Sequence, residues 1–350
     1  MNTRRDLIPQ QTPSCASFRL FLPLLAGLAI LAVLPPVIAA PPPVAWANVS
    51  GTVNDDYGRA FAVDADGNSY LAGSFDGTAT FGGTVLSSVG ARNRPDMFVA
   101  KYNSAGQLEW VRQAGGTGTD LAFGIAVDAA GNVLFTGSSD STTLNIAGTG
   151  LTVSGKKAVL AKLSPAGTLL WAKTSMDQLF FPPAEASGMV VGNDAAGNHY
   201  VAGHFTGTIN FGGTPGFFPP PVGGLVLTNT FDTDIFLLKY TPSGTVVWAR
   251  QVSGENLQEV RSMAVTPAGE VHLAGRFNGT ASFGRTNLTS GNASFDTDAF
   301  LAKWNPPRGF AMGQASGWQR HRSRLGSYPG RRRRAAFHRG LQEFEPLGGP

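Results

Sequence analysis

Short apolar runs separated by glycine-containing turns recur along most of the chain. One type of turn, with the pattern Asp-x-x-Gly-Asn or a close variant, joins two apolar runs at residues 63–68, 127–132, 193–198 and 265–270. An apolar run ending in lysine also recurs, at Lys101, Lys162, Lys239 and Lys303. A tryptophan stands nine residues after the first three lysines, at Trp110, Trp171 and Trp248. Runs of this length and composition predict short antiparallel β-strands joined by tight turns.

Each repeat is predicted to contain four strands. In the second repeat they cover about residues 124–128, 133–137, 158–164 and 169–173. A variable excursion containing a Phe-Gly-Gly segment lies between the second and third strands. Four antiparallel strands repeated in tandem are typical of β-propeller blades, which bury their faces by stacking. We therefore predict an all-β chain with about four blades, at residues 58–113, 122–175, 188–252 and 261–305.

The repeat resembles the bacterial SBBP family of β-propeller repeats. The resemblance rests on the Asp-x-x-Gly-Asn turn, the tryptophan, Ala-Gly-x-Phe-x-Gly-Thr at residues 202–208 and 274–280, and Asp-x-Phe-x-x-Lys at residues 234–239 and 298–303. It implies a propeller on exported or surface-associated proteins and no defined reaction. The second repeat departs most from this pattern, because Lys157 replaces the aspartate.

The N-terminus has the pattern of an export signal. Basic residues precede an apolar stretch at residues 20–40, which ends in small residues suited to a signal peptidase. We predict a signal peptide at residues 1–39 and a propeller at 40–305, and an uncleaved membrane anchor is the alternative. The single cysteine, Cys15, would leave with the signal peptide, so we expect neither a disulfide nor a thiolate nucleophile in the mature chain.

The positive net charge of +4 is concentrated at the C-terminus. Residues 306–350 contain nine Arg and two Glu, whereas residues 41–305 contain 15 Lys and Arg and 20 Asp and Glu. The body is thus mildly acidic, and the sequence gives no reason to predict nucleic-acid binding.

The repeat pattern stops after Trp304. Met312 stands where the next tryptophan is due, and reading the codons one base out of frame restores a segment compatible with Trp-Val-Arg-Gln-Ala-Gly-Gly, as at residues 110–116. The same shift allows Asp-Ala-Ala-Gly at residues 330–333. We predict that residues 306–350 are a frameshifted tail without regular structure, and that the ring is incomplete.

Residues 46–50 resemble the outer strand that ends a repeat. Trp46 followed by Ala-Asn-Val-Ser-Gly compares with Trp248 and the residues that follow it. We predict a closing strand that completes the last blade of the intact ring, a blade whose other strands are lost. The alternative is that it completes the fourth blade and closes a small ring.

Two sets of acidic residues have spacing that suggests calcium. Asp64, Asp66 and Asn68 alternate as in a calcium loop, but the glycine is misplaced and no distal Glu follows. Asp232 with Asp234, and Asp296 with Asp298, precede strands in pairs. We interpret all of them as turn and capping residues, and predict no cofactor.

One position varies while its surroundings repeat. It follows the strand-ending glycine of each blade and holds Ser74, Ser138, His204 and Arg276. We interpret it as an exposed position that can also face a ligand.

These patterns predict a binding or structural module that is secreted or held in the cell envelope, with no catalytic activity. The partner is expected to be an extracellular protein or glycan, with membrane contact only if the N-terminal segment stays uncleaved. Two alternatives remain: a non-functional gene remnant, and a hydrolase or lyase with its site in the central channel, which would need polar groups converging there.

Overall fold

The computed structural model describes residues 44–177, 183–213, 223–229, 232–291 and 297–305, and the backbone of 309–316. The signal-peptide prediction for residues 1–39 lies outside the described residues, as does the tail from residue 317. None of the described residues forms a helix that is long and apolar enough to span a membrane.

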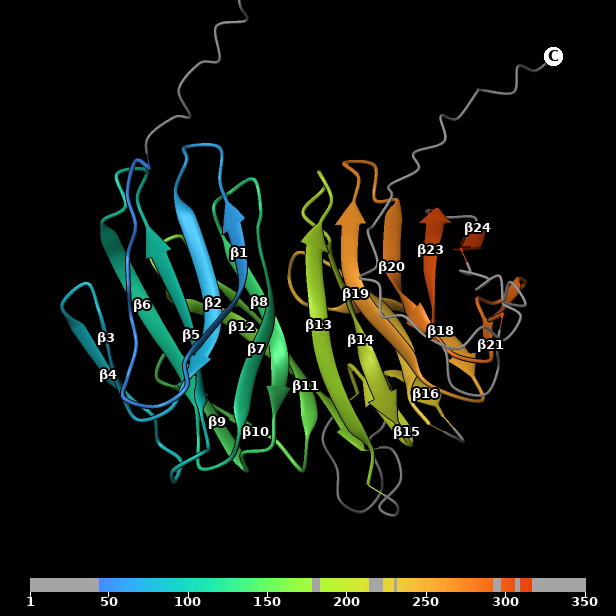
Figure 1. Ribbon diagram of the computed structural model, residues 1–350, viewed down its shortest axis with the longest axis horizontal. Helices are drawn as coiled ribbons and strands as arrows, with labels where there is room; N and C mark the ends of the chain where they lie inside the picture. The colour runs from blue at the N-terminus through green and yellow to red at the C-terminus, as the bar shows by residue number, and fades with distance from the viewer. Residues whose placement is uncertain are drawn as a thin grey trace, which may run out of the picture. The chain divides into compact units, whose positions relative to one another are not determined.

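The described chain is all-β, as predicted, and its strands form four consecutive antiparallel blades (Figure 1). Blade 1 consists of β1 (Tyr57–Val63), β2 (Ser69–Phe75), β5 (Asp96–Tyr102) and β6 (Leu108–Gly115). Blade 2 consists of β7 (Asp120–Val127), β8 (Val133–Ser139), β11 (Lys157–Leu163) and β12 (Leu169–Asp177). Blade 3 consists of β13 (Glu185–Asn193), β14 (His199–Thr206), β17 (Asp234–Tyr240) and β18 (Val246–Gly254). Blade 4 consists of β19 (Gln258–Val265), β20 (Val271–Phe277), β23 (Asp298–Asn305) and β24 (Gly309–Ser316).

The first strand of each blade is the inner one. Strands β1, β7, β13 and β19 contact one another in succession, so they converge as inner strands of a propeller do. Each contains a β-bulge, as between Ala122 and Gly124, opposite the end of the second strand. At this bulge the two backbones approach so closely that a Cβ on Gly137 would lie 2.0 Å from the carbonyl oxygen of Leu121. The glycine repeated there is therefore required by the backbone.

The predicted excursion forms a two-stranded hairpin in every blade. The hairpins are β3 (Thr78–Phe81) with β4 (Thr84–Ser87), β9 (Thr143–Ile146) with β10 (Thr149–Thr152), β15 (Thr208–Phe211) with β16 (Leu225–Thr228), and β21 (Thr280–Ser282) with β22 (Asn287–Thr289). Strands β9, β15 and β21 each pair with the outer strand of the preceding blade. The excursion therefore joins consecutive blades by hydrogen bonds, a role that the sequence did not reveal.

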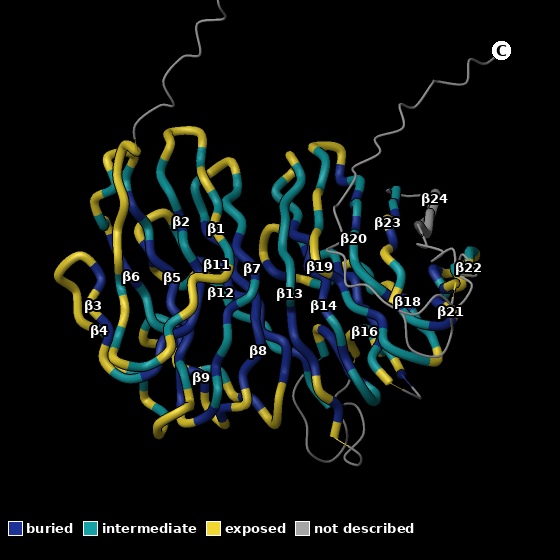
Figure 2. Tube along the Cα trace, viewed as in Figure 1, coloured by how far each residue is buried: buried dark blue, intermediate teal, exposed yellow. Residues whose placement is uncertain are grey.

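Three apolar clusters fill the spaces between consecutive blades. We call the face of a blade that is turned toward the preceding blade its leading face, and the opposite one its trailing face. Between blades 1 and 2, for example, Tyr70 and Val99 of one trailing face pack with Ile125 and Phe135 of the next leading face. Corresponding clusters join blade 2 to blade 3 and blade 3 to blade 4. Figure 2 shows the buried residues concentrated along these adjoining strands.

A fourth cluster belongs to blade 1 alone. Phe75, Phe81, Phe98 and Tyr102 lie on its leading face, and within the described residues no other blade covers them. The described blades do not close into a ring, in agreement with the predicted incomplete ring.

The backbone continues regularly into the segment where the repeat pattern stops. Strand β24 pairs with β23 and places Met312 opposite Lys303, as Trp110 lies opposite Lys101 in blade 1. We predicted a tail without regular structure from residue 306, so the strand at Gly309–Ser316 is a difference. It follows from the free edge of β23, with which any extended segment can pair. The frameshift itself stays a prediction.

Candidate functional site

The turns that suggested calcium are closed by their own hydrogen bonds. The carboxylate of Asp64 accepts hydrogen bonds from the backbone N–H groups of Asp66 and Asn68, the Asn68 side chain and the Tyr70 hydroxyl. Burial raises the pKa of Asp64, but the hydrogen bonds from Asn68 outweigh it, so that the pKa is lowered. Asp128 and Asp194 repeat this geometry. The interpretation as a turn is supported at all three positions.

The repeated lysines are paired with these turns or with neighbouring acids. Lys162 lies 2.9 Å from Asp128, and both side chains are buried. Lys239 lies 3.6 Å from Asp194, while Lys303 lies 2.8 Å from Glu270 with both side chains about one-third exposed. These pairs hold the end of the third strand against the first turn of the same blade, which is a structural role.

The paired acidic candidates are also explained by local contacts. Asp234 is 2% exposed and accepts hydrogen bonds from Gln251 and the backbone of Gly254. Burial raises its pKa despite these bonds. Asp298 accepts a hydrogen bond from the N–H of Gly291, and Asp232 accepts one from the Thr233 hydroxyl. Asp296 lies outside the described residues.

The lysine that replaces the repeated aspartate in the second repeat has an acidic partner of its own. Lys157 is 1% exposed, lies 3.2 Å from Asp177 and donates a hydrogen bond to the carbonyl oxygen of Ala184 in blade 3. In blade 1 the corresponding Asp96 is bound by Gln113 instead, and burial raises the pKa of Asp96 to about 6. The buried lysine of blade 2 thus has an acidic partner, whereas the buried aspartates of blades 1 and 3 accept a hydrogen bond from a neutral glutamine.

The variable position is not exposed in the first two blades. Ser74 and Ser138 are 0% and 2% exposed and lie on trailing faces, so the prediction of an exposed position is wrong for them. The reason is that the following blade covers a trailing face. His204 is half-buried, and Arg276 has a side-chain exposure of 43% because no described blade follows blade 4.

Charged residues gather where this position meets the inner strand of blade 4. Glu259 pairs with Arg276 across the hairpin, and its carboxylate lies 2.7 Å from Arg276 and 2.5 Å from Arg261. The hydrogen bond from Arg276 is the main cause that lowers the pKa of Glu259. His204 of blade 3 is close enough to be influenced by Glu259, but burial dominates and lowers its pKa.

Glu259 and Arg261 were not identified from the sequence. The signal that would have found them is hairpin register, since the residues opposite Ser74, Ser138, His204 and Arg276 are Tyr57, Leu121, Ser187 and Glu259. Glu259 is the charged residue among these four, so blade 4 differs from the other blades at this position. Two guanidinium groups share one carboxylate here, which leaves an excess positive charge suited to a carboxylate or another anion.

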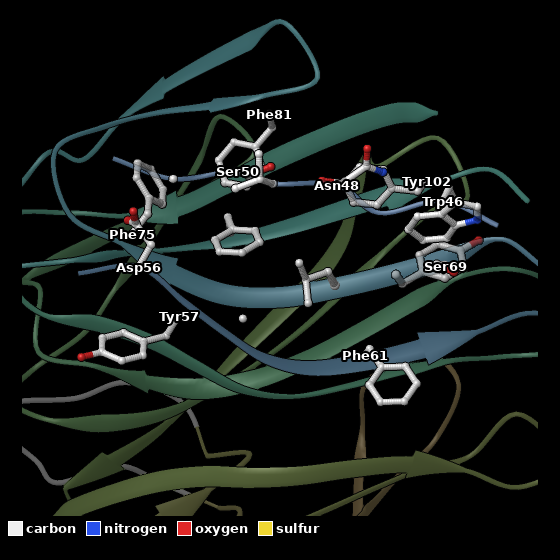
Figure 3. Close-up of a pocket in the computed structure, with 16 residues that line it drawn as sticks. Trp46, Asn48, Ser50, Asp56, Tyr57, Phe61, Ser69, Phe75, Phe81 and Tyr102 are labelled. Atoms are coloured by element: carbon white, nitrogen blue, oxygen red, sulfur yellow. The ribbon is translucent and has the colours of Figure 1, made fainter. Parts of the chain in front are cut away.

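A groove of about 430 Å³ runs along the leading face of blade 1 (Figure 3). It lies between this face and the N-terminal segment at residues 46–51. Aromatic rings dominate the lining, including Trp46, Tyr57, Phe61 and Tyr102, and Asp56 contributes a carboxylate. Trp46 stacks on Tyr102 with ring centroids 6.4 Å apart. Such a lining suits an apolar partner.

Within the described residues, no group of three or more His, Cys, Asp or Glu side chains is arranged to hold a metal ion. The titratable groups discussed above are engaged in turns, ion pairs or blade contacts, and each contact recurs at equivalent positions of other blades or compensates a charge. This arrangement supports the rigidity of a repeat scaffold.

Comparison with known proteins agrees with the blade architecture. The SBBP family, described as a β-propeller repeat, matches residues 109–145, which confirms the resemblance inferred from the repeat. An uncharacterized WD repeat-containing protein, L264, of Acanthamoeba polyphaga mimivirus is 24% identical over 67% of this chain. The match spans 19% of that protein's length. The chain is thus a β-propeller repeat protein.

Proposed function

We propose that this chain is an exported, non-catalytic binding module that recognises an acidic group on an extracellular protein or glycan. The observation that carries the proposal is the cluster of Glu259, Arg261 and Arg276 on the first two strands of blade 4. Arg261 and Arg276 are 58% and 43% exposed, and a single carboxylate neutralises the two guanidinium groups only in part. Half-exposed arginines in a fixed position bind planar anions by paired hydrogen bonds.

The repeat architecture supports this proposal in two further ways. Propellers and WD repeats serve widely as interaction scaffolds, and their inner strands and connecting loops face partners. Among the described residues, many of the buried acids and lysines are used in turns or blade contacts, whereas Arg261 and Arg276 pair with one acid of their own blade. Export is supported by the basic and apolar pattern of residues 1–40.

The proposal is tested with the purified full chain on arrays of acidic and neutral peptides and glycans. We expect binding to carboxylate-bearing members, a loss of at least about tenfold in affinity for Arg261→Gln, and weakening at high salt because the interaction is ionic. Arg285→Gln is the matched control, since it removes the same charge from an exposed position of the same blade. Equal loss in both variants would refute a specific site at Arg261.

Export is tested separately by cell fractionation and protease accessibility. We expect the chain outside the cytoplasm, shortened at its N-terminus by about the predicted signal peptide. Retention in the cytoplasm at full length would contradict the exported role without bearing on the anion site.

A further inference from the structure

Large apolar side chains are exposed on the outward-facing surfaces of the first and the last blade. Phe61 on the leading face of blade 1 is 77% exposed, whereas Ile125, at the same position of blade 2, is 8% exposed. At the other end, Leu301 on the trailing face of blade 4 is 55% exposed, whereas Val99, at the same position of blade 1, is 1% exposed. Large apolar side chains left open at both ends indicate surfaces that are normally covered.

The interfaces inside the chain show what covers such a surface. Each leading face of blades 2, 3 and 4 packs against the trailing face of the blade before it. Blade 1 has the same aromatic and aliphatic leading residues, but its cluster has no contribution from a second blade. The surface that fits there is therefore a trailing face of this repeat, and within the described residues the trailing face of blade 4 is the one left uncovered.

The N-terminal segment already occupies the place of an outer strand. Gly51 bridges to Thr80 of β3, as Gly115 of the outer strand β6 pairs with Asn145 of β9. Trp46 packs over Gly106, which repeats the packing of Trp110 over Gly167. Residues 46–51 are thus docked on blade 1 in the register of a preceding blade's last strand.

The other edge of this segment lacks the strand that a blade would supply. In the first three blades the tryptophan of the outer strand pairs with the repeated lysine, as Trp110 does with Lys101. In blade 4, Lys303 pairs with Met312 of β24 instead. Trp46 at one end of the array therefore has no repeated lysine opposite it, and Lys303 at the other end has no tryptophan, within the described residues.

We propose that the leading face of blade 1, together with residues 46–51, docks onto blade 4 of a second copy of this chain. The segment replaces β24 as the outer strand of that blade, and Trp46 takes the place opposite Lys303. The contact is head-to-tail and reciprocal, so two copies bury both pairs of open faces and form a closed ring of eight blades. Arg276 is then covered as Ser74 and Ser138 are, so the anion site proposed above is open only in the single chain. The phenylalanine and leucine at the open ends are then covered as their counterparts are within the chain.

The first test is a disulfide between strands in the full chain, with Cys15→Ser to remove the native thiol. Residues opposite each other in antiparallel strands are close enough for a disulfide. Val99 lies opposite Arg112 in blade 1, and the proposal places Leu301 opposite Asn48 of the second copy. We expect Leu301→Cys with Asn48→Cys to give a disulfide-linked dimer on non-reducing gels, whose mobility reverts on reduction.

The other outcomes overturn the proposal. A link within one chain would show that residues 46–51 close a ring of four blades. Absence of this link, together with an intrachain link between Leu301→Cys and Gln314→Cys, would show that β24 keeps its place. The pair Val99→Cys and Arg112→Cys is the positive control, because it has the same register inside a blade.

The second test measures mass in solution by light scattering. We expect twice the chain mass for the wild type, with dissociation on dilution, and the mass of one chain for Phe61→Asp at the same concentration. Leu170→Asp is the control, since Leu170 is 51% exposed on the outer strand of blade 2 and should leave the dimer intact. A wild-type chain that remains monomeric at high concentration would refute the second copy as occupant.

Discussion

The two faces of blade 1 differ although they belong to the same four strands. Its trailing face is joined to blade 2 through a shared apolar cluster, with Tyr70 and Val99 each 1% exposed. Its leading face carries residues of the same kind, and Phe75 and Phe98 are 0% and 4% exposed, but Phe61 on the inner strand is 77% exposed. The repeat sequence specifies a surface that needs a neighbour, and only position in the array decides whether the chain itself supplies one.

The largest loss of stability is expected at the glycine opposite the β-bulge, a position that has the same backbone geometry in blade 1 and blade 2. A Cβ on Gly137 would lie 2.0 Å from the carbonyl oxygen of Leu121, and on Gly73 it would lie 1.9 Å from that of Tyr57. We expect Gly137→Ala and Gly73→Ala each to lower the free energy of unfolding by roughly 4 kcal/mol or more, or to prevent folding. Urea unfolding measures this.

Gly150→Ala is the control for the glycine variants, because its Cβ would meet only a flexible side-chain atom of Thr143 at 3.3 Å. A small loss for Gly73→Ala beside a large loss for Gly137→Ala would mean that blade 1 is less rigid than blade 2 in its backbone as well as at its open face.

The ion pairs of the repeated lysines allow the covered face of blade 2 to be compared with the open face of blade 4. Lys162→Met leaves the buried carboxylate of Asp128 without its partner, and we expect a loss of about 3 kcal/mol in the free energy of unfolding. Lys303→Met breaks a pair that is about one-third exposed, so its loss should stay below about 1 kcal/mol. Equal losses in urea unfolding would contradict an open trailing face on blade 4.

A core truncation compares the two leading faces directly. Ile125→Ala removes a side chain that is 8% exposed between blades 1 and 2, and should cost about 2–4 kcal/mol. Phe61→Ala removes a larger side chain at the same position of blade 1, yet should cost under about 0.5 kcal/mol in dilute, monomeric protein. A greater cost at high protein concentration would indicate the docked second copy.

The last effect, which is absent at neutral pH, concerns the pH dependence of the contact between blades 2 and 3. His199 packs against Trp171 with tilted rings and lies 3.3 Å from Lys162. Burial, followed by the charge of Lys162, lowers the pKa of His199 to about 4 from 6.5. In this range the unfolded chain binds the proton more readily than the folded chain does, so stability is full above about pH 6.5 and falls as the pH is lowered toward 4.

Replacement of this histidine should remove that component. We expect the stability of His199→Gln to depend less on pH between 4 and 6.5 than that of the wild type, as followed by thermal unfolding at each pH. An unchanged slope would assign the dependence to other groups. His272→Gln is the control, since it alters a histidine on the uncovered trailing face of blade 4.

Sequence alone determined the architecture of the blades. The recurring turn, lysine and tryptophan defined four antiparallel strands per repeat. Strand and turn preferences act over a few residues, and in a tandem repeat the same pattern can be compared at several places in the chain. The turns around the repeated aspartates could be predicted for the same reason, since an Asx turn is made by side chains only two to four residues apart. The likeness of residues 46–50 to the other outer strands was also visible in the sequence, and the closing of a ring by this segment stays a prediction.

Tertiary structure decided which surfaces are open. The sequence gives Ser74, Ser138, His204 and Arg276 the same place in the repeat, but burial depends on whether another blade follows, and this is a contact between segments about 65 residues apart. The pairing of the hairpins of blades 2, 3 and 4 with the preceding blade, and the cluster around Glu259, arise in the same way. Local sequence patterns determine a strand and its turn. Which surfaces lie against that strand depends on how the blades stack, and this stacking decides which side chains are buried and which charges have partners.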